Sequence, residues 1–325
     1  MPRLIRKQQV KVPAPLTLKE FHEKRNKVLV VRETGGLGDM LIHRMMFEDF
    51  KRAMPEAEIT LACRPAYLPI MEGHPFIDKV VDYNKIDPLD WIVHYNTSSA
   101  CTRYEIAMAP YSGLHRSDIW AQHCGVVLKN HCMHLKITEE MKKVGRELVG
   151  KIWDGTKPKV LFCPISAMKV KDLSSYQIDP VIDHIRKRGC FVYSTHKYPI
   201  PELSRLNVPV ICGISFVHWM GVVNEADYVV TVDTSHFHLA GELKKPLVGV
   251  FTFADGKVYG RYYDFVLVQK HRDNGDWDCG PCYNWGNCTK TEKVPKPCLT
   301  EITAEMIIEG VDKMFDKWPL SNIGN

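Results

Sequence analysis

The sequence predicts an α/β protein with two doubly wound domains that face each other across a cleft. Short β-branched runs alternate with helical stretches in both halves of the chain, and the first run leads into a glycine-rich turn. In addition, 325 residues exceed what one hydrophobic core usually holds. We expect a basic extension over residues 1–26, a first Rossmann-like domain over 27–155 and a second over 156–325.

The first βαβ unit comes directly after the extension. Residues 27–32 form an apolar run typical of a buried parallel strand, and a turn over residues 34–39 follows. Residues 40–54 have apolar side chains at helical spacing and stop before Pro55, and residues 58–63 supply the second strand. Residues 64–135 contain several X-Pro turns, so we expect a substrate-facing loop region there.

The alternation restarts at a strand over residues 159–163. We expect Asp179 to cap a helix that begins at Pro180 and ends at Gly189. A final amphipathic helix begins near Thr303. Further strands are predicted over residues 190–194, 208–212, 228–232 and 247–251, with helices around 217–226 and 237–244.

Charge and cysteine content exclude several classes of protein. The formal net charge is +5, but residues 1–27 alone carry +6, so the body of the chain is nearly neutral. No stretch approaches 18 consecutive apolar residues, and the N-terminus lacks the apolar segment of a signal peptide. Most of the 11 cysteines are scattered through predicted strands and helices, which favours reduced thiols. These features predict a cytoplasmic protein.

The glycine-rich turn does not match a dinucleotide fingerprint. Gly36 and Gly38 lack the third glycine, and the second strand ends in Cys63-Arg64 instead of a ribose-binding acid, which argues against NAD. Asp39, in contrast, begins a helix, where N–H groups and the helix dipole keep a carboxylate ionised. It could act as a general base, or it could only cap its helix.

A second polar motif, residues 233–240, follows a strand and opens a helix. Free N–H groups and hydroxyls at such a position form an anion site suited to a diphosphate. A well-capped, solvated helix start is the alternative. The side chains that could contact the anion are Thr234, Ser235, His236, His238 and, from the loop after residue 163, Lys169 or Lys171.

Short motifs in both halves of the chain together resemble glycosyltransferase family 9, the heptosyltransferase family. They are residues 28–32, 38–39, 54–59 and 74–78 in the first half and residues 226–234, 238–240, Pro246 and Phe251 in the second, and the resemblance covers most of residues 27–318. It implies a GT-B fold with an N-terminal acceptor domain and a C-terminal nucleotide-sugar domain. It also implies inverting transfer without a required catalytic metal.

The resemblance implies roles for individual residues. Asp39 becomes the base that deprotonates the acceptor hydroxyl, and Asp233, Thr234 and His238 fall on the donor motif. Lys171 falls near the position of the lysine that contacts phosphate in the family. Lys169 is the alternative candidate for that position. Ser235 stands where the family usually has glycine. The family's ribose-binding acid has no secure match, and Glu202 is the candidate for it.

The remaining constellation is a cysteine cluster over residues 279–298. Cys279 and Cys282 form a C-x2-C knuckle, and Cys288 and Cys298 can complete a tetrahedral site for zinc or iron. Such a closed site would be structural. Reduced thiols and a disulfide are the alternatives. Related clusters occur near the C-terminus of some members of the resembled family.

The sequence therefore predicts an inverting glycosyltransferase. Its donor would be a nucleotide-diphosphate sugar of the heptose type, and its acceptor a hydroxyl of a saccharide or a protein. A hydroxylated base in DNA is an alternative acceptor, suggested by the basic extension. A noncatalytic module that binds nucleotide sugar or nucleic acid, with Asp39 only as a cap, is the alternative outside enzymes.

Overall fold

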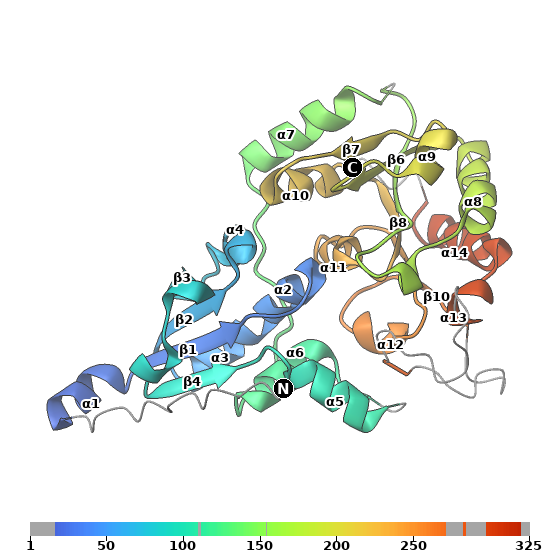
Figure 1. The fold of residues 1–325 in the computed structure, drawn as a ribbon. Helices are drawn as coiled ribbons and strands as arrows, with labels where there is room; N and C mark the ends of the chain where they lie inside the picture. Colours follow the sequence, from blue (N-terminus) through green and yellow to red (C-terminus); the bar gives the residue numbers. More distant parts are fainter. Residues whose placement is uncertain (1–16, 110–111, 154, 271–281, 284–296, 320–325) are drawn as a thin grey trace, which may run out of the picture.

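The chain folds into two parallel sheets with helices on their faces (Figure 1), as the sequence predicts. The computed structural model describes residues 17–109, 112–153, 155–270, 282–283 and 297–319. Most of the predicted extension, residues 1–16, therefore lies outside the described residues.

The first sheet has the strand order β3-β2-β1-β4. Its strands are β1 (Lys27–Arg32), β2 (Glu58–Cys63), β3 (Lys79–Asp82) and β4 (Val93–Asn96). The predictions for β1 and β2 are confirmed, and Val30 of β1 pairs with Leu61 on one side and Tyr95 on the other. The prediction of loops over residues 64–135 is wrong in part, because β3 and β4 lie there. Both are short, half-exposed edge strands. Their polar residues interrupt the apolar pattern by which buried strands were predicted.

The helical elements up to residue 155 connect these strands and lead into the second half, and the helix predicted over residues 40–54 is divided. A 3₁₀ turn separates α2 from α3 at residues 44–46. The helical elements are α1 (Leu18–Lys24), α2 (Leu37–His43), η1 (Arg44–Met46), α3 (Phe47–Ala53), η2 (Pro65–Tyr67), α4 (Leu68–Met71), η3 (Tyr83–Lys85), η4 (Pro88–Asp90), α5 (Ala100–Met108), α6 (Arg116–His123) and α7 (Glu139–Gly150).

The second sheet has the order β10-β9-β8-β5-β6-β7, the doubly wound order of a Rossmann fold. Its strands are β5 (Lys159–Cys163), β6 (Phe191–His196), β7 (Val210–Cys212), β8 (Tyr228–Val232), β9 (Leu247–Val250) and β10 (Val266–Val268). The first five were predicted from β-branched runs, with ends that differ by up to two residues. The strand β8 is buried along its whole length in the middle of the sheet.

The predicted start of one helix in this half is wrong. The helix α8 begins at Ser175, not at Pro180, because Ser174 and Gln177 form a capping box that outweighs the Asp179-Pro180 signal. Its end at Gly189, with φ +82°, and the cap of α14 by Thr303 agree with the prediction. The helical elements are η5 (Lys169–Lys171), α8 (Ser175–Lys187), α9 (Pro201–Arg205), α10 (Phe216–Asn224), α11 (Ser235–Glu242), α12 (Gly256–Tyr259), α13 (Pro297–Thr300) and α14 (Ala304–Lys317).

The most extensive helix contacts between the halves are those of α7 with α10 and of α2 with α11. The helix α7, which falls in the range predicted for the first domain, packs instead along α10 of the second half (Figure 1). The start of α2 meets the start of α11, where a Cβ on Gly38 would lie 3.4 Å from the backbone nitrogen of Ser235. This contact between α2 and α11 brings together two helix starts that carry candidate site residues, Asp39 and Ser235.

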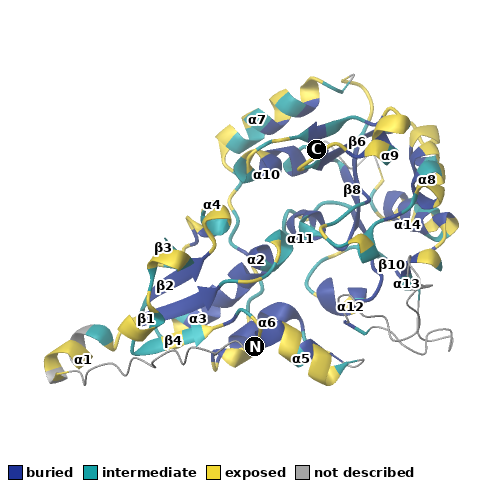
Figure 2. Cartoon of the chain, in the orientation of Figure 1, coloured by how far each residue is buried: buried dark blue, intermediate teal, exposed yellow. Residues whose placement is uncertain are grey.

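The core is continuous from one half to the other. The larger cluster of buried apolar side chains includes Val30 of the first sheet and Phe237 of α11. The central strands β1 and β8 are buried, while the outer face of α7 is largely exposed (Figure 2). None of the helices in the described part of the chain combines the length and apolar character needed to cross a bilayer.

Candidate active site

A cleft of about 700 Å³ lies between the halves, at the carboxyl ends of the parallel strands. Its walls are formed by segments that follow β1, β2, β5, β6, β7 and β8. Ligands of doubly wound sheets bind at this edge. The predicted site residues that line the cleft are Gly36, Gly38, Asp39, Lys171, Asp233, Thr234, Ser235, His236 and His238.

Asp39 is held at the first turn of α2. Its Oδ2 accepts a hydrogen bond from the N–H of Gly36 at 2.9 Å, and its Oδ1 accepts one from Arg116 at 2.5 Å. The residue therefore caps its helix and also lines the cleft. Burial raises the pKa of the Asp39 carboxyl, but Arg116 and Arg32 outweigh burial and hold that pKa well below its ordinary value. Asp39 is thus ionised throughout the neutral range.

The sequence analysis missed three buried residues that support this carboxylate. Arg116 of α6 forms a two-pronged ion pair with Glu105 of α5, with both N–O distances 2.7 Å. Tyr259 of α12, from the second half, donates its hydroxyl to Glu105 at 3.0 Å. Each lies far from Asp39 in the sequence, so local spacing carried no signal for them. Arg116 and Tyr259 also line the cleft.

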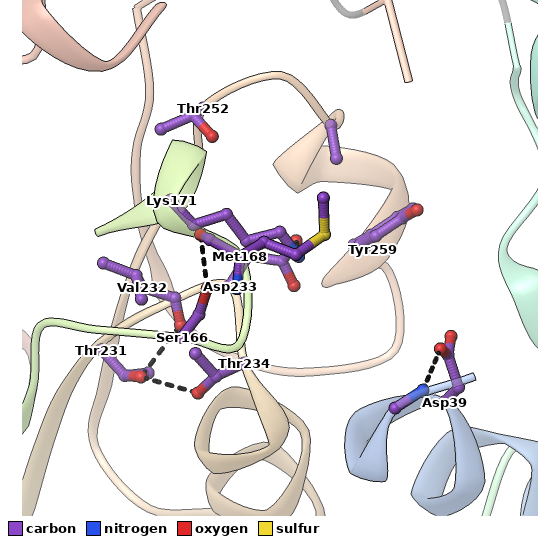
Figure 3. A network of polar contacts seen from close by, with 12 residues as sticks. Asp39, Ser166, Met168, Lys171, Thr231, Val232, Asp233, Thr234, Thr252 and Tyr259 are labelled. Carbon is purple, nitrogen blue, oxygen red and sulfur yellow. Dashed lines mark hydrogen bonds and ion pairs between the residues drawn. The ribbon is translucent and has the colours of Figure 1, made fainter. Parts of the chain in front are cut away.

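On the opposite wall, Asp233 pairs with Lys171 at 2.7 Å (Figure 3). Both side chains are about nine-tenths buried. Lys169 is exposed and does not line the cleft, so the structure brings Lys171 and not Lys169 to the donor motif. Figure 3 shows Asp39 across the cleft from Asp233 and Thr234.

The start of α11 combines capping with an open wall of the cleft. The Thr234 hydroxyl accepts a hydrogen bond from the N–H of His236 at 3.2 Å and so caps the helix. Burial lowers the pKa of His236 to about 3 and that of His238 to about 4, so both imidazoles are neutral at pH 7. Because Trp219 donates to Nε2 of His236 at 2.8 Å, the ring proton of His236 is on Nδ1.

The far end of the cleft was not predicted. Gly213, Ile214 and Phe216, which follow β7, line it together with Trp219 of α10, and the Phe216 and Trp219 rings lie 5.2 Å apart. The two rings are tilted by 34° relative to each other, and an apolar aromatic wall of this kind suits an aromatic base. Glu202, the candidate ribose-binding acid, lies on α9 and does not line the cleft.

The predicted cysteine site falls partly outside the described residues, which exclude Cys279 and Cys288. Cys282 and Cys298 are both partly buried against the larger apolar cluster. The described part of the chain contains no group of side chains that could hold a metal ion. The metal at this cluster therefore stays a prediction.

This arrangement, with a carboxylate on one half and a capped helix start with a lysine on the other, is that of a GT-B glycosyltransferase. Residues 116–271 match the model of glycosyltransferase family 9 (heptosyltransferase). The match confirms the resemblance seen in the sequence motifs. A comparison with curated protein sequences finds no match.

Solved structures establish the same fold over nearly the whole chain. A family 9 glycosyltransferase from Veillonella parvula has a TM-score of 0.67 and 15% identity, over 90% of this chain and 97% of the other. The E. coli ADP-heptose lps heptosyltransferase II has a TM-score of 0.64 and 14% identity, over 90% and 99%. The iron-containing heptosyltransferase TibC of enterotoxigenic E. coli, solved with ADP-D-β-D-heptose, has a TM-score of 0.68 and 13% identity, over 93% and 80%.

Proposed function

We propose that the protein transfers a sugar from a nucleotide diphosphate to an acceptor hydroxyl, with inversion at the anomeric carbon. The observation that carries this proposal is the shared cleft: Asp39 of the first half and the start of α11 in the second half both line it. One direct displacement needs a base for the nucleophile and donors for the departing diphosphate, and the two walls supply one of each.

Asp39 is the proposed base. Each of its oxygens already accepts one hydrogen bond and has a second lone pair, so an acceptor hydroxyl can donate to either. Its low pKa makes it a weak base, but the hydroxyl becomes acidic as its oxygen bonds to the anomeric carbon. The proton then moves to the carboxylate while the bond from the anomeric carbon to the diphosphate oxygen breaks.

The second half receives the leaving group. Thr234, Ser235 and Lys171 all line the cleft at or beside the start of α11, and we propose that their hydroxyls and ammonium, with the N–H groups of the helix start, contact the diphosphate. Fixed donors of this kind stabilise charge as it develops on the departing diphosphate. His238, neutral and next to Gly38, can add a neutral hydrogen bond.

For the donor we propose a nucleotide sugar of the ADP-heptose type, because the two heptosyltransferases above are named for, or were solved with, that compound. The aromatic wall at Phe216 and Trp219 is the proposed place of the base. For the acceptor we propose a hydroxyl of a saccharide or protein. A cytoplasmic location is part of the proposal. A nucleic-acid acceptor depended on the basic extension, most of which lies outside the described residues.

Two measurements test the proposal. Thermal shift against a panel of nucleotide sugars identifies the donor, since a ligand at 100 times its dissociation constant stabilises a protein by about 2.7 kcal/mol. Asp39→Asn should then lower kcat at least about 100-fold while ADP affinity is retained. Asp90→Asn, at an exposed position outside the cleft, is the matched control. Turnover of Asp39→Asn within threefold of wild type contradicts the assignment of the base.

We further propose that Cys279, Cys282, Cys288 and Cys298 hold one structural ion, iron or zinc. Thiolate donors suit both metals, and the iron in TibC supports the first. Metal analysis of the purified protein should find about one ion per chain. Replacing Cys282 and Cys298 by Ser should remove the ion and lower the melting temperature while ADP affinity persists in the folded fraction. No metal in wild type contradicts this proposal.

A further inference from the structure

A chain of buried polar contacts leads from Asp39 to the other half of the molecule. Arg116 donates one guanidinium nitrogen to Asp39 and two others to Glu105, and Tyr259 donates its hydroxyl to Glu105. The guanidinium carbon of Arg116 also lies 5.0 Å from the centre of the Tyr259 ring. Arg116, Glu105 and Tyr259 are exposed by 6% or less, so water does not compete for these contacts.

The charges in this cluster balance. Asp39 and Glu105 contribute two negative charges, and Arg116 and Arg32 contribute two positive ones. Arg32 is engaged elsewhere, since it donates to the carbonyls of Thr97 and Ser98 at 2.7 and 3.3 Å. Arg116 is the cation whose hydrogen bond sets the position of the Asp39 carboxylate.

The other titratable groups around Asp39 cannot replace Arg116. Tyr67 donates to the carbonyl of Gly35 at 3.1 Å, and burial raises the pKa of Cys101 and keeps its thiol protonated. His43 and His238 are buried and have lowered pKa values, so both are neutral.

We propose that Arg116 is a positioning residue for the base, and that Tyr259 holds Arg116 in place through Glu105. The inference rests on the proposed role of Asp39. It adds that the geometry of the base, which belongs to the first half, depends on a hydroxyl supplied by the second half. The base is then fully oriented only where the halves are joined.

The first test needs no substrate. In protein labelled with ¹³Cγ-aspartate, the Asp39 signal is assigned by its loss in Asp39→Asn, and its titration is followed by NMR. Arg116→Gln, which removes the charge, should raise the titration midpoint of Asp39 by at least about one pH unit. Arg116→Lys keeps the charge, so its midpoint should stay near that of wild type. An unchanged midpoint in Arg116→Gln overturns the role of Arg116.

The second test separates positioning from simple contact between the halves. Tyr262, three residues after Tyr259, donates its hydroxyl to Asp118 of α6 at 2.7 Å and also bridges the halves. The other hydrogen-bond partner of the Asp118 carboxylate is His131, at 2.9 Å, and not the pair of Arg116 and Glu105. Tyr259→Phe and Tyr262→Phe therefore each remove one hydrogen bond from a tyrosine of the second half to a carboxylate of the first half. We expect kcat to fall about tenfold in Tyr259→Phe and to stay within threefold in Tyr262→Phe, with unchanged ADP affinity in both.

Turnover is read as ADP released from ADP-D-β-D-heptose with water as the acceptor. Equal losses in the two tyrosine variants, or no loss in Tyr259→Phe, overturn the link through Tyr259. If Asp39→Asn turns over like wild type, the proposed function fails instead. The NMR titration still decides whether Arg116 holds the carboxylate.

Discussion

The crossing of α7 and α10 allows a stability prediction with an internal control. A Cβ on Gly145 of α7 would lie 2.3 Å from the carbonyl oxygen of Gly221 on α10, whereas actual Cβ contacts stay above 3.0 Å. The obstacle is backbone, so the helices must separate by at least about 0.7 Å. Overpacking of this kind costs about 1–3 kcal/mol.

Gly150 lies at the end of the same helix and has nothing within 4 Å of its added Cβ. Alanine gains up to about 1 kcal/mol over glycine in a helix, and this gain largely cancels between the two variants. Gly145→Ala should therefore be less stable than Gly150→Ala by about the overpacking cost, 1–3 kcal/mol.

Urea unfolding followed by tryptophan fluorescence measures this difference, because Trp219 lies in α10 and Trp153 follows α7. The midpoint should decrease in Gly145→Ala with little change in the slope of the transition. Thermal unfolding should show a melting temperature lower by about 2–4 °C for each kcal/mol. If Gly145→Ala is as stable as Gly150→Ala, the close helix contact is wrong.

Three further predictions concern charge and the junction. Lys171→Met should raise the dissociation constant of ADP at least about tenfold by calorimetry, since a charged hydrogen bond contributes about 1.5–3 kcal/mol, whereas Lys169→Met should leave it unchanged. Burial raises the pKa of Asp118, but hydrogen bonds from His131 and Tyr262 prevail and lower it. Asp118 thus stabilises the fold at pH values above the ordinary carboxyl pKa, and this contribution is lost as the pH falls through the lower pKa of the folded state. Asp118→Asn should therefore lower the melting temperature at pH 7 and make the melting temperature less dependent on pH below about 4. Gly38→Ala would place a methyl group 3.1 Å from an imidazole carbon of α11, so kcat/KM should fall while that of Gly150→Ala stays near wild type.

Local patterns predicted most of the fold because the buried strands are continuous apolar runs. The exceptions have physical causes. The edge strand β4 includes His94 and Asn96, and a half-exposed polar strand resembles a loop. In α8, the cap at Ser174 depends on Gln177 reaching back to it, and this was outweighed by the more obvious Asp179-Pro180 signal.

Prediction of the site was limited in a different way. Asp39 and Thr234, which line the cleft at helix starts, could be found because the chemistry of a helix N-terminus is local. Lys171 could not be told from Lys169, because the conformation of the short 3₁₀ turn decides which ammonium enters the cleft. Arg116 carried no local signal, because its role depends on contacts with residues 11, 77 and 143 positions away.

The site depends on the junction because its parts are divided between the halves. Asp39 and Arg116 come from the first half, and Lys171 and the start of α11 from the second. Tyr259 crosses from the second half to the support of the base, and Gly38 brings α2 within contact of α11. Neither half alone therefore contains both the proposed base with its full support and the proposed anion site. Variants that separate the halves should lower turnover more than they lower affinity for ADP. ADP is proposed to contact the second half alone, whereas the transition state requires groups from both halves.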